Sequence, residues 1–213
     1  LRPLARVALR AFCRLAGWAA DAVVVAKDGL DDAFGGPERC VKVRNYATPA
    51  PILPRAHAPG PLRLVHLGAL GRARGAFTML LTLSRLPPQT ELVLAGRFTD
   101  GSEAEFTTAA AELGLAPRVT SLPWMPRQAA LDIAAGCDLG LVLFQPGVEN
   151  HRLALPHKLF DCMLAGLPVI VPDFAEEVAA VVREAGCGLT VDTADPAAVA
   201  AAVQRLADPA LRS

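Results

Sequence analysis

Residues 149–172 read ENHRLALPHKLFDCMLAGLPVIVP, and this stretch decides the fold class. Pro156 suits the first turn of a helix, where the N–H that proline lacks would have no helical partner. Gly166 and Pro168 are typical of a helix end, and the apolar run VIV that follows predicts a buried strand. The stretch therefore predicts a helix over 156–165 that leads directly into a strand of a parallel sheet.

Outward from this stretch, strands and helices alternate along the chain. Strands are predicted near residues 62–67, 91–95, 118–122, 138–143, 168–171 and 188–191. Helices are predicted near residues 75–86, 102–114, 126–135, 156–165, 174–186 and 195–207. Because this alternation requires right-handed crossovers, it indicates an α/β fold: a Rossmann-like parallel sheet with helices on both faces. Ligands of such sheets bind beyond the carboxyl ends of the strands.

Residues 46–61, YATPAPILPRAHAPGP, interrupt this pattern with five prolines and no periodicity. They predict an interdomain linker. Upstream, residues 1–45 contain a helix and two short strand candidates, and the start at Leu1 rather than Met suggests a piece of a longer protein. The prediction is therefore a domain remnant at 1–45, a linker at 46–61 and a Rossmann-like domain at 62–213.

The overall composition excludes several classes of protein. The 21 Lys and Arg balance the 21 Asp and Glu, which argues against a nucleic-acid binder, and 53% hydrophobic residues argue against disorder. The apolar runs are shorter than the roughly 18 residues that a membrane-spanning helix needs. The five cysteines form no C-x-x-C pair, so they predict neither a disulfide framework nor a zinc site and favour a cytoplasmic location.

The neutral total hides an uneven distribution. Residues 1–60 hold nine Lys and Arg against five Asp and Glu, and residues 61–213 hold twelve against sixteen. An arginine recurs every four residues among apolar positions at the start of the chain, which predicts an amphipathic helix. Its arginines are Arg2, Arg6, Arg10 and Arg14. Two interpretations stay open: a solvated face of a helix packed on its own domain, or peripheral contact with an anionic membrane.

The loop GALGRARG, at 68–75, joins a predicted strand to a predicted helix. It matches neither the dinucleotide fingerprint nor the P-loop. Its glycines give a flexible backbone, and Arg72 and Arg74 lie close to the expected helix N-terminus, which favours an anionic ligand. A plain surface turn would have a similar sequence.

The helix predicted over 156–165 offers a second place for chemistry. Lys158 lies in its first turn and Asp161 one turn later. Free helix amides with a lysine suit a diphosphate, and a carboxylate suits the hydroxyls of a ribose, so the pair favours a sugar nucleotide. A capped helix with a solvent-facing lysine and aspartate is the alternative. We interpret the four histidines as loop or surface residues without a catalytic partner: His57, His66, His151 and His157.

The string PHKLFDCMLAGLPVI at 156–170 resembles the donor-site motif of the retaining glycosyltransferase family four, which has the GT-B fold. Segments VRNYATP at 43–49, RLVHLGALGRARG at 63–75 and the run from RVTSLPWMPRQ at 118–128 resemble the same family in the same order. The resemblance implies the C-terminal, donor-binding half of a GT-B fold, preceded by the last part of the N-terminal acceptor domain.

The resemblance also implies roles for particular residues. Asp161 falls where the family has a glutamate that binds the ribose, and Arg74 and Lys158 are the candidate catalytic cations near the diphosphate. The implied donor-binding residues are Gly68, Arg72, Arg74, Trp124, Met125, Leu155, Pro156, Lys158 and Asp161. Trp124 could equally be a packing residue.

The chain departs from the family pattern at two positions. Ala69 stands where the family has an arginine, and Leu153 stands where it commonly has a glutamate that holds the donor sugar. Glu149 or Asn150 could replace that glutamate only if the loop folds back. These departures leave open a catalytically inactive module that binds nucleotide sugars, and a sugar-nucleotide epimerase is a further alternative.

The function implied by the resemblance is transfer of a sugar from a nucleoside-diphosphate sugar to a hydroxyl acceptor, with retention and with no metal or other cofactor. Polysaccharide, glycolipid or other glycan biosynthesis is the implied setting. The acceptor, a glycan, lipid or small molecule, would be bound mainly by an N-terminal domain absent from this chain. The chain alone is therefore expected to bind donor and transfer little.

Overall fold

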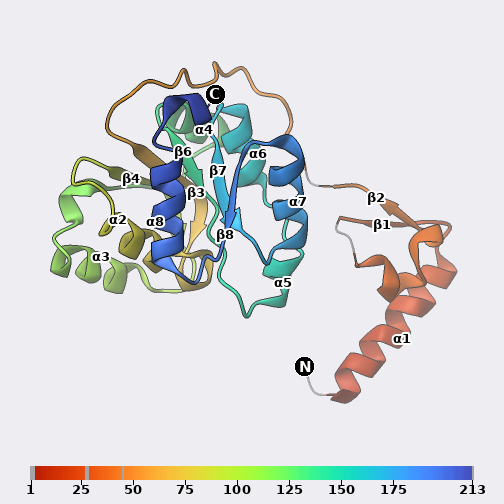
Figure 1. Ribbon diagram of the computed structural model, residues 1–213. Coiled ribbons are helices and arrows are strands. Elements are labelled where there is room, and N and C mark those ends of the chain that lie inside the picture. The colour runs from red at the N-terminus through yellow and green to blue at the C-terminus, as the bar shows by residue number, and fades with distance from the viewer. Residues whose placement is uncertain (1–2, 27–28, 45, 213) are drawn as a thin grey trace. The chain divides into compact units, whose positions relative to one another are not determined.

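The computed structural model describes residues 3–26, 29–44 and 46–212 of the chain (Figure 1). It divides into two compact units, Leu1–Tyr46 and Ala47–Ser213, called unit 1 and unit 2 below. Among the described residues, no helix combines the length and the apolar character needed to span a membrane.

Unit 1 is built around one long helix and a small sheet. Its regular elements are α1 (Pro3–Ala19), β1 (Val23–Val25) and β2 (Cys40–Lys42), and the two strands pair in parallel. Gly17 of α1 lies against the backbone of Phe34, where a Cβ atom would collide with the carbonyl oxygen. Arg39 fastens the same end of the helix, because its Nη1 donates to the carbonyl oxygen of Gly17 at 2.9 Å.

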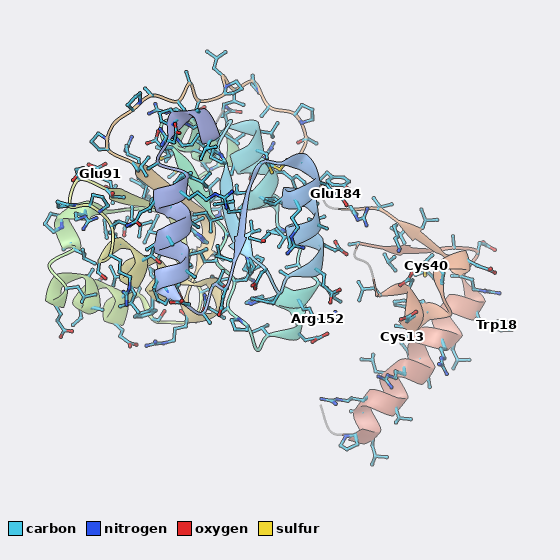
Figure 2. The ribbon with its side chains drawn as sticks, in the orientation of Figure 1. Cys13, Trp18, Cys40, Glu91, Arg152 and Glu184 are labelled. Carbon is cyan, nitrogen blue, oxygen red and sulfur yellow. The ribbon has the colours of Figure 1, made fainter. Side chains whose placement is uncertain are left out.

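The two faces of α1 have unexpected surroundings within unit 1. At 100° per residue, Arg10 and Arg14 lie on the same side of the helix as Gly17, and they line a hollow with Asp32. The apolar side is exposed: Leu4 is 85% and Trp18 75% accessible, and Trp18 stands at the C-terminal end of α1 (Figure 2). The arginine side is therefore the side that approaches the rest of unit 1, because a glycine on that side leaves room for the chain.

Unit 2 confirms the predicted six-stranded parallel sheet. The strand order is β5-β4-β3-β6-β7-β8, and every neighbouring pair is parallel. The strands are β3 (Arg63–Leu70), β4 (Glu91–Phe98), β5 (Val119–Leu122), β6 (Leu139–Leu141), β7 (Val169–Pro172) and β8 (Gly188–Val191).

Helices cover both faces of this sheet, as the alternating pattern predicts (Figure 1). The helices are α2 (Ala76–Leu83), α3 (Glu103–Glu112), α4 (Arg127–Ala135), α5 (Glu149–Arg152), α6 (His157–Leu164), α7 (Glu176–Ala185) and α8 (Pro196–Arg205). Successive residues of β3 point to opposite faces, so Leu64 packs with α2, α3 and α8, and Val65 packs with α4, α6 and α7. The short helix α5 is additional to the prediction.

Residues 47–61, inside the segment predicted as a linker, have no helix or strand and belong to unit 2. The backbone N–H of Arg55 donates to the carbonyl oxygen of Ala165 at 2.8 Å, and Nε2 of His57 lies 2.8 Å from the carbonyl oxygen of Gly166. Gly166 has a φ of +72°, and a Cβ there would lie 2.8 Å from Pro54. The segment is thus fastened to the end of α6.

Asp138, directly before β6, anchors this segment to unit 2. Its side chain is 4% exposed and accepts hydrogen bonds from the backbone N–H of Arg63 at 2.9 Å and from Nη2 of Arg55 at 3.3 Å. Replacing Asp138 leaves both donors without their acceptor, and a buried donor without a partner costs about 1–3 kcal/mol.

We predict that Asp138→Ala lowers the free energy of unfolding of unit 2 by about 2 kcal/mol, measured by urea unfolding. Asp132→Ala removes an exposed carboxylate on α4 and should change it by less than about 0.5 kcal/mol. Equal effects of the two substitutions would contradict the anchoring role of Asp138.

Candidate functional site

A hollow of about 320 Å³ opens at the carboxyl ends of β3 and β4, between the loop that precedes α4 and the N-terminus of α6. Six of the nine predicted donor-binding residues line it: Gly68, Trp124, Met125, Pro156, Lys158 and Asp161. The structure therefore brings together residues that lie up to 93 positions apart, from Gly68 to Asp161. Trp124 is 67% exposed, so the packing interpretation of this side chain is not supported.

Two glycines allow the strands to end as they do beside the hollow. Gly68 has a φ of +84°, a conformation that residues with a Cβ rarely adopt. Gly96, its neighbour on β4, lies so close that a Cβ there would collide with the carbonyl oxygen of Gly68. The backbone of β3 and β4 thus reaches the edge of the hollow without side chains in the way.

Lys158 reaches from the first turn of α6 to the central strand. Its Nζ lies 2.7 Å from Nε2 of His66 and 3.5 Å from the carbonyl oxygen of Ala69. Nδ1 of His66 lies 2.9 Å from the carbonyl oxygen of Leu141 on β6. Lys158 and His66 lie 92 positions apart in the sequence, so no local sequence pattern indicates this contact.

The interpretation of the histidines as loop or surface residues is wrong for two of the four, His66 and His151, and His57 is a loop residue whose side chain is nevertheless enclosed. His66 is fully buried within β3, His151 is buried against the ring of Phe144, and the side chain of His57 is 2% exposed. A histidine between apolar neighbours in a strand can be buried when a backbone carbonyl and a donor side chain satisfy its two ring nitrogens, as His66 shows.

Burial and nearby charges set the protonation states of Lys158 and His66. Removal from water, together with the charge of Arg74, lowers the pKa of Lys158 from 10.5 to about 7. Burial, together with the charge of Lys158, lowers the pKa of His66 from 6.5 to about 3. His66 is therefore a neutral imidazole at ordinary pH, and Lys158 titrates close to neutrality.

Asp161 lines the hollow one turn along α6 from Lys158 and is held by Arg127, which sequence reasoning missed. Nε of Arg127 donates to Oδ1 of Asp161 at 2.9 Å, and its Nη2 donates to the carbonyl oxygen of Thr48 at 3.0 Å. The one available signal was position, because Arg127 opens α4 directly after Trp124 and Met125. Arg127 thus orients the carboxylate and ties it to the segment that enters unit 2.

The other three predicted donor-binding residues do not line the hollow. Arg72 pairs with Glu105 on α3, and its guanidinium lies 4.3 Å from the ring centroid of Phe77. Arg74 lies 5.3 Å from the ring centroid of Phe144. The side chain of Leu155 is buried in the hydrophobic core. Of the loop at 68–75, only Gly68 lines the hollow, and Arg74 lies close enough for its charge to lower the pKa of Lys158.

The replacement of the missing glutamate by Glu149 is not supported. Glu149 lies on α5 with its side chain 78% exposed, and its Oε1 accepts from Arg152 at 2.9 Å. Arg152, which Figure 2 shows at the edge of unit 2, also pairs with Glu176 at 2.6 Å. Asn150 is an exposed residue of the same short helix. Leu153 directly follows this helix. Glu149 is therefore near the position of the missing glutamate in sequence, but its carboxylate pairs with Arg152 at the surface.

A model of the family described as glycosyl transferases group 1 matches residues 61–208, more than half of the chain. The chain belongs to this family. No curated protein sequence matches the chain.

Solved structures place this group 1 domain within the GT-B fold. Alr3699/HepE of Anabaena, solved in complex with UDP, is 20% identical with a TM-score of 0.73, over 96% of this chain and 60% of that one. Sucrose-phosphate synthase of Thermosynechococcus elongatus is 21% identical with a TM-score of 0.68, over 94% and 53%. The C-terminal domain of a group 1 glycosyl transferase from Francisella tularensis is 15% identical with a TM-score of 0.60, over 72% and 80%. The chain therefore spans about 60% of the first neighbour and corresponds to the C-terminal half of the fold.

Metal-binding side chains do not gather in the described part of this group 1 domain. Among the residues at 3–26, 29–44 and 46–212, no three His, Cys, Asp or Glu side chains come close enough to hold a metal ion. All five cysteines are free thiols.

The lowered pKa of Lys158 predicts a pH-dependent stability. Between pH 7 and pH 10.5 the unfolded chain binds a proton that the folded chain does not, so the wild type gains stability as pH rises through this window. Lys158→Met removes this titration. Its advantage over the wild type should be largest near pH 6.5 and shrink toward pH 9, by on the order of 1 kcal/mol per pH unit. Urea unfolding at both pH values measures the difference, and a constant difference would contradict the buried ammonium.

Proposed function

We propose that the chain is the donor-binding half of an enzyme that transfers a sugar from a nucleoside-diphosphate sugar to a hydroxyl group. The proposal is carried by the hollow of this group 1 domain, where Lys158 and Asp161 stand one helical turn apart beyond the strand ends. The complexes of the Anabaena neighbour with UDP and with UDP-glucose support a uridine nucleotide as the first donor to test.

The proposed donor lies along the hollow from the loop before α4 to the first turn of α6. Its diphosphate meets Lys158 and the backbone at Gly68, and its base lies beside Trp124 and Met125. Its ribose hydroxyls donate to the carboxylate of Asp161, which Arg127 holds in place. Hydrogen bonds between charged groups contribute about 1.5–3 kcal/mol each, so these contacts suffice to select a charged nucleotide.

The proposed transfer retains the configuration at the anomeric carbon and uses no metal ion. As the bond from the sugar to the diphosphate breaks, negative charge grows on the leaving phosphate. Lys158 and, from the neighbouring loop, Arg74 are the cations that stabilise this charge, and the backbone amides at the start of α6 add to it. Preorganised donors in a partly enclosed site are effective at this task, because they need no reorientation during the reaction.

The acceptor is part of the proposal at the level of chemical class. We propose that unit 1 is the last part of the acceptor-binding domain and that the acceptor is a glycan, lipid or small molecule of a glycan-building route in the cytoplasm. Since the chain spans about 60% of the first neighbour, transfer is proposed for a complete two-domain protein, and donor binding for this chain.

The transfer proposal predicts a product that depends on Asp161. A complete two-domain chain, assayed with labelled UDP-, GDP- and ADP-sugars and hydroxyl acceptors, should transfer sugar from one donor. Asp161→Ala should lower kcat/KM by roughly tenfold or more, because the ribose loses its carboxylate partner, while Asp132→Ala on the neighbouring helix should not. Conversion of the donor to an isomeric sugar nucleotide without transfer would support the epimerase, and binding without either reaction would support the inactive module.

Peripheral membrane contact belongs to the same proposal. On α1, Leu4, Phe12 and Trp18 are each at least 67% exposed, and arginines flank this apolar side of the helix, with Arg14 one turn before Trp18 and Arg10 one turn before Arg14. Apolar side chains flanked by arginines can insert between anionic headgroups, and each arginine near the surface contributes about 1 kcal/mol.

Binding to vesicles tests this contact in the two-domain protein. Replacing Arg6, Arg10 and Arg14 together by Gln should weaken binding to vesicles of phosphatidylcholine and phosphatidylglycerol by on the order of 100-fold. The matched control replaces three exposed arginines of unit 2, Arg85, Arg183 and Arg205, with the same change of charge. Equal losses in the two variants would show a dependence on net charge alone and would reject a role of α1.

A further inference from the structure

His66 is a buried polar side chain in the middle of an apolar strand, and the proposed donor contacts leave it without a role. It is fully buried, it comes from the central strand β3, and its ring contacts three polar groups. These are the carbonyl oxygen of Leu141 at 2.9 Å from Nδ1, and the carbonyl oxygen of Ala69 at 3.1 Å and Nζ of Lys158 at 2.7 Å from Nε2.

The groups around the His66 ring determine which of its two nitrogens carries the hydrogen. The carbonyl oxygens of Leu141 and Ala69 can only accept, so the tautomer depends on which nitrogen has another partner. With the hydrogen on Nε2, Nδ1 would face the oxygen of Leu141 without a hydrogen between them, whereas with the hydrogen on Nδ1, Leu141 accepts from Nδ1 and Lys158 donates to Nε2. A neutral imidazole has one N–H, which leaves Nε2 as an acceptor. Lys158 is the donor within reach, at a distance typical of a strong hydrogen bond.

The two acceptors on β3 determine where the ammonium of Lys158 lies. Nε2 of His66 at 2.7 Å and the carbonyl oxygen of Ala69 at 3.5 Å take two of its three N–H groups. The third is available to an anionic oxygen in the hollow, which Lys158 lines. A lysine side chain otherwise loses considerable rotamer freedom when it binds one ligand atom, and an acceptor that holds it beforehand reduces this cost.

We infer that His66 is a positioning residue, which holds the ammonium of Lys158 at the place where the diphosphate of the donor binds. This inference rests on the proposed function. A neutral acceptor suits the role, because a carboxylate at the same place would neutralise Lys158 and repel the diphosphate. Ala69 supports the arrangement through its carbonyl oxygen.

A comparison of nucleoside and nucleoside-diphosphate binding by this chain isolates the contribution of the diphosphate to affinity. Isothermal titration calorimetry with UDP, GDP and ADP and with their nucleosides gives, for the nucleotide that binds most tightly, the ratio of nucleoside Kd to nucleoside-diphosphate Kd. We expect Lys158→Ala to lower this ratio by about tenfold or more, since it removes the ammonium. His66→Met keeps the volume and removes the acceptor, and it should also lower the ratio by about tenfold, with nucleoside binding unchanged.

Two further variants distinguish positioning from a structural role. His66→Gln retains a side-chain acceptor and should keep the ratio within about threefold of the wild type. In the Lys158→Ala background, His66→Met should lower the ratio no further, because His66 acts through Lys158. An unchanged ratio in His66→Met, equal losses in His66→Met and His66→Gln, or additive losses in the double variant would each overturn the inference and leave the proposed function standing. A wild type that binds none of the three diphosphates would overturn the proposed function and this inference with it.

The ring of His66 gives a second readout that needs no ligand and no variant. Long-range ¹H–¹⁵N spectra of the wild type should show a neutral imidazole with its hydrogen on Nδ1, unchanged from pH 5 to pH 9. A hydrogen on Nε2, or a ring that titrates in this range, would overturn the inference, because Nε2 could then not accept from Lys158.

Discussion

The burial of β3 on both faces is the constraint on which the rest of unit 2 depends. The strand lies between β4 and β6, where the order of the sheet reverses, and its successive side chains fill the cores on both faces. A strand enclosed in this way can present chemistry only at its carboxyl end, beyond the last side chains that pack. The hollow opens toward that end, where Leu67 and Gly68 line it, and Lys158 lines the hollow and reaches back to His66 inside the strand.

The fold could be predicted from the sequence because its signals are local. Apolar runs typical of strands alternate regularly with helical segments that end in glycine or proline, and this alternation predicts six parallel strands with covering helices. The short helix α5 could not be predicted, because four residues with a surface ion pair carry no periodicity. The segment at 47–61 has linker composition, yet its contacts with Asp138 and the end of α6 depend on residues about 80 to 110 positions away.

The site was predictable in its parts and not in its pairings. Lys158 and Asp161 follow from one motif, and the structure places both in one hollow. Their partners, His66 and Arg127, come from β3 and α4, and a histidine inside an apolar run looks like any polar interruption in a sequence. Arg72 shows the converse, because a loop arginine with a promising position pairs with Glu105 on the next helix instead.

The contacts of the segment at 47–61 with the rest of unit 2 determine where a donor domain can be cut for transfer to another protein. The family model begins at residue 61, but the buried carboxylate of Asp138 and the exposed end of α6 take their partners from Arg55 and His57 upstream of that point. In a chimera joined at residue 62, the buried carboxylate of Asp138 would lose its ion pair with Arg55. Arg127 would lose its hydrogen bond to the carbonyl oxygen of Thr48. The unit that recombination or design can move between proteins therefore starts at Ala47.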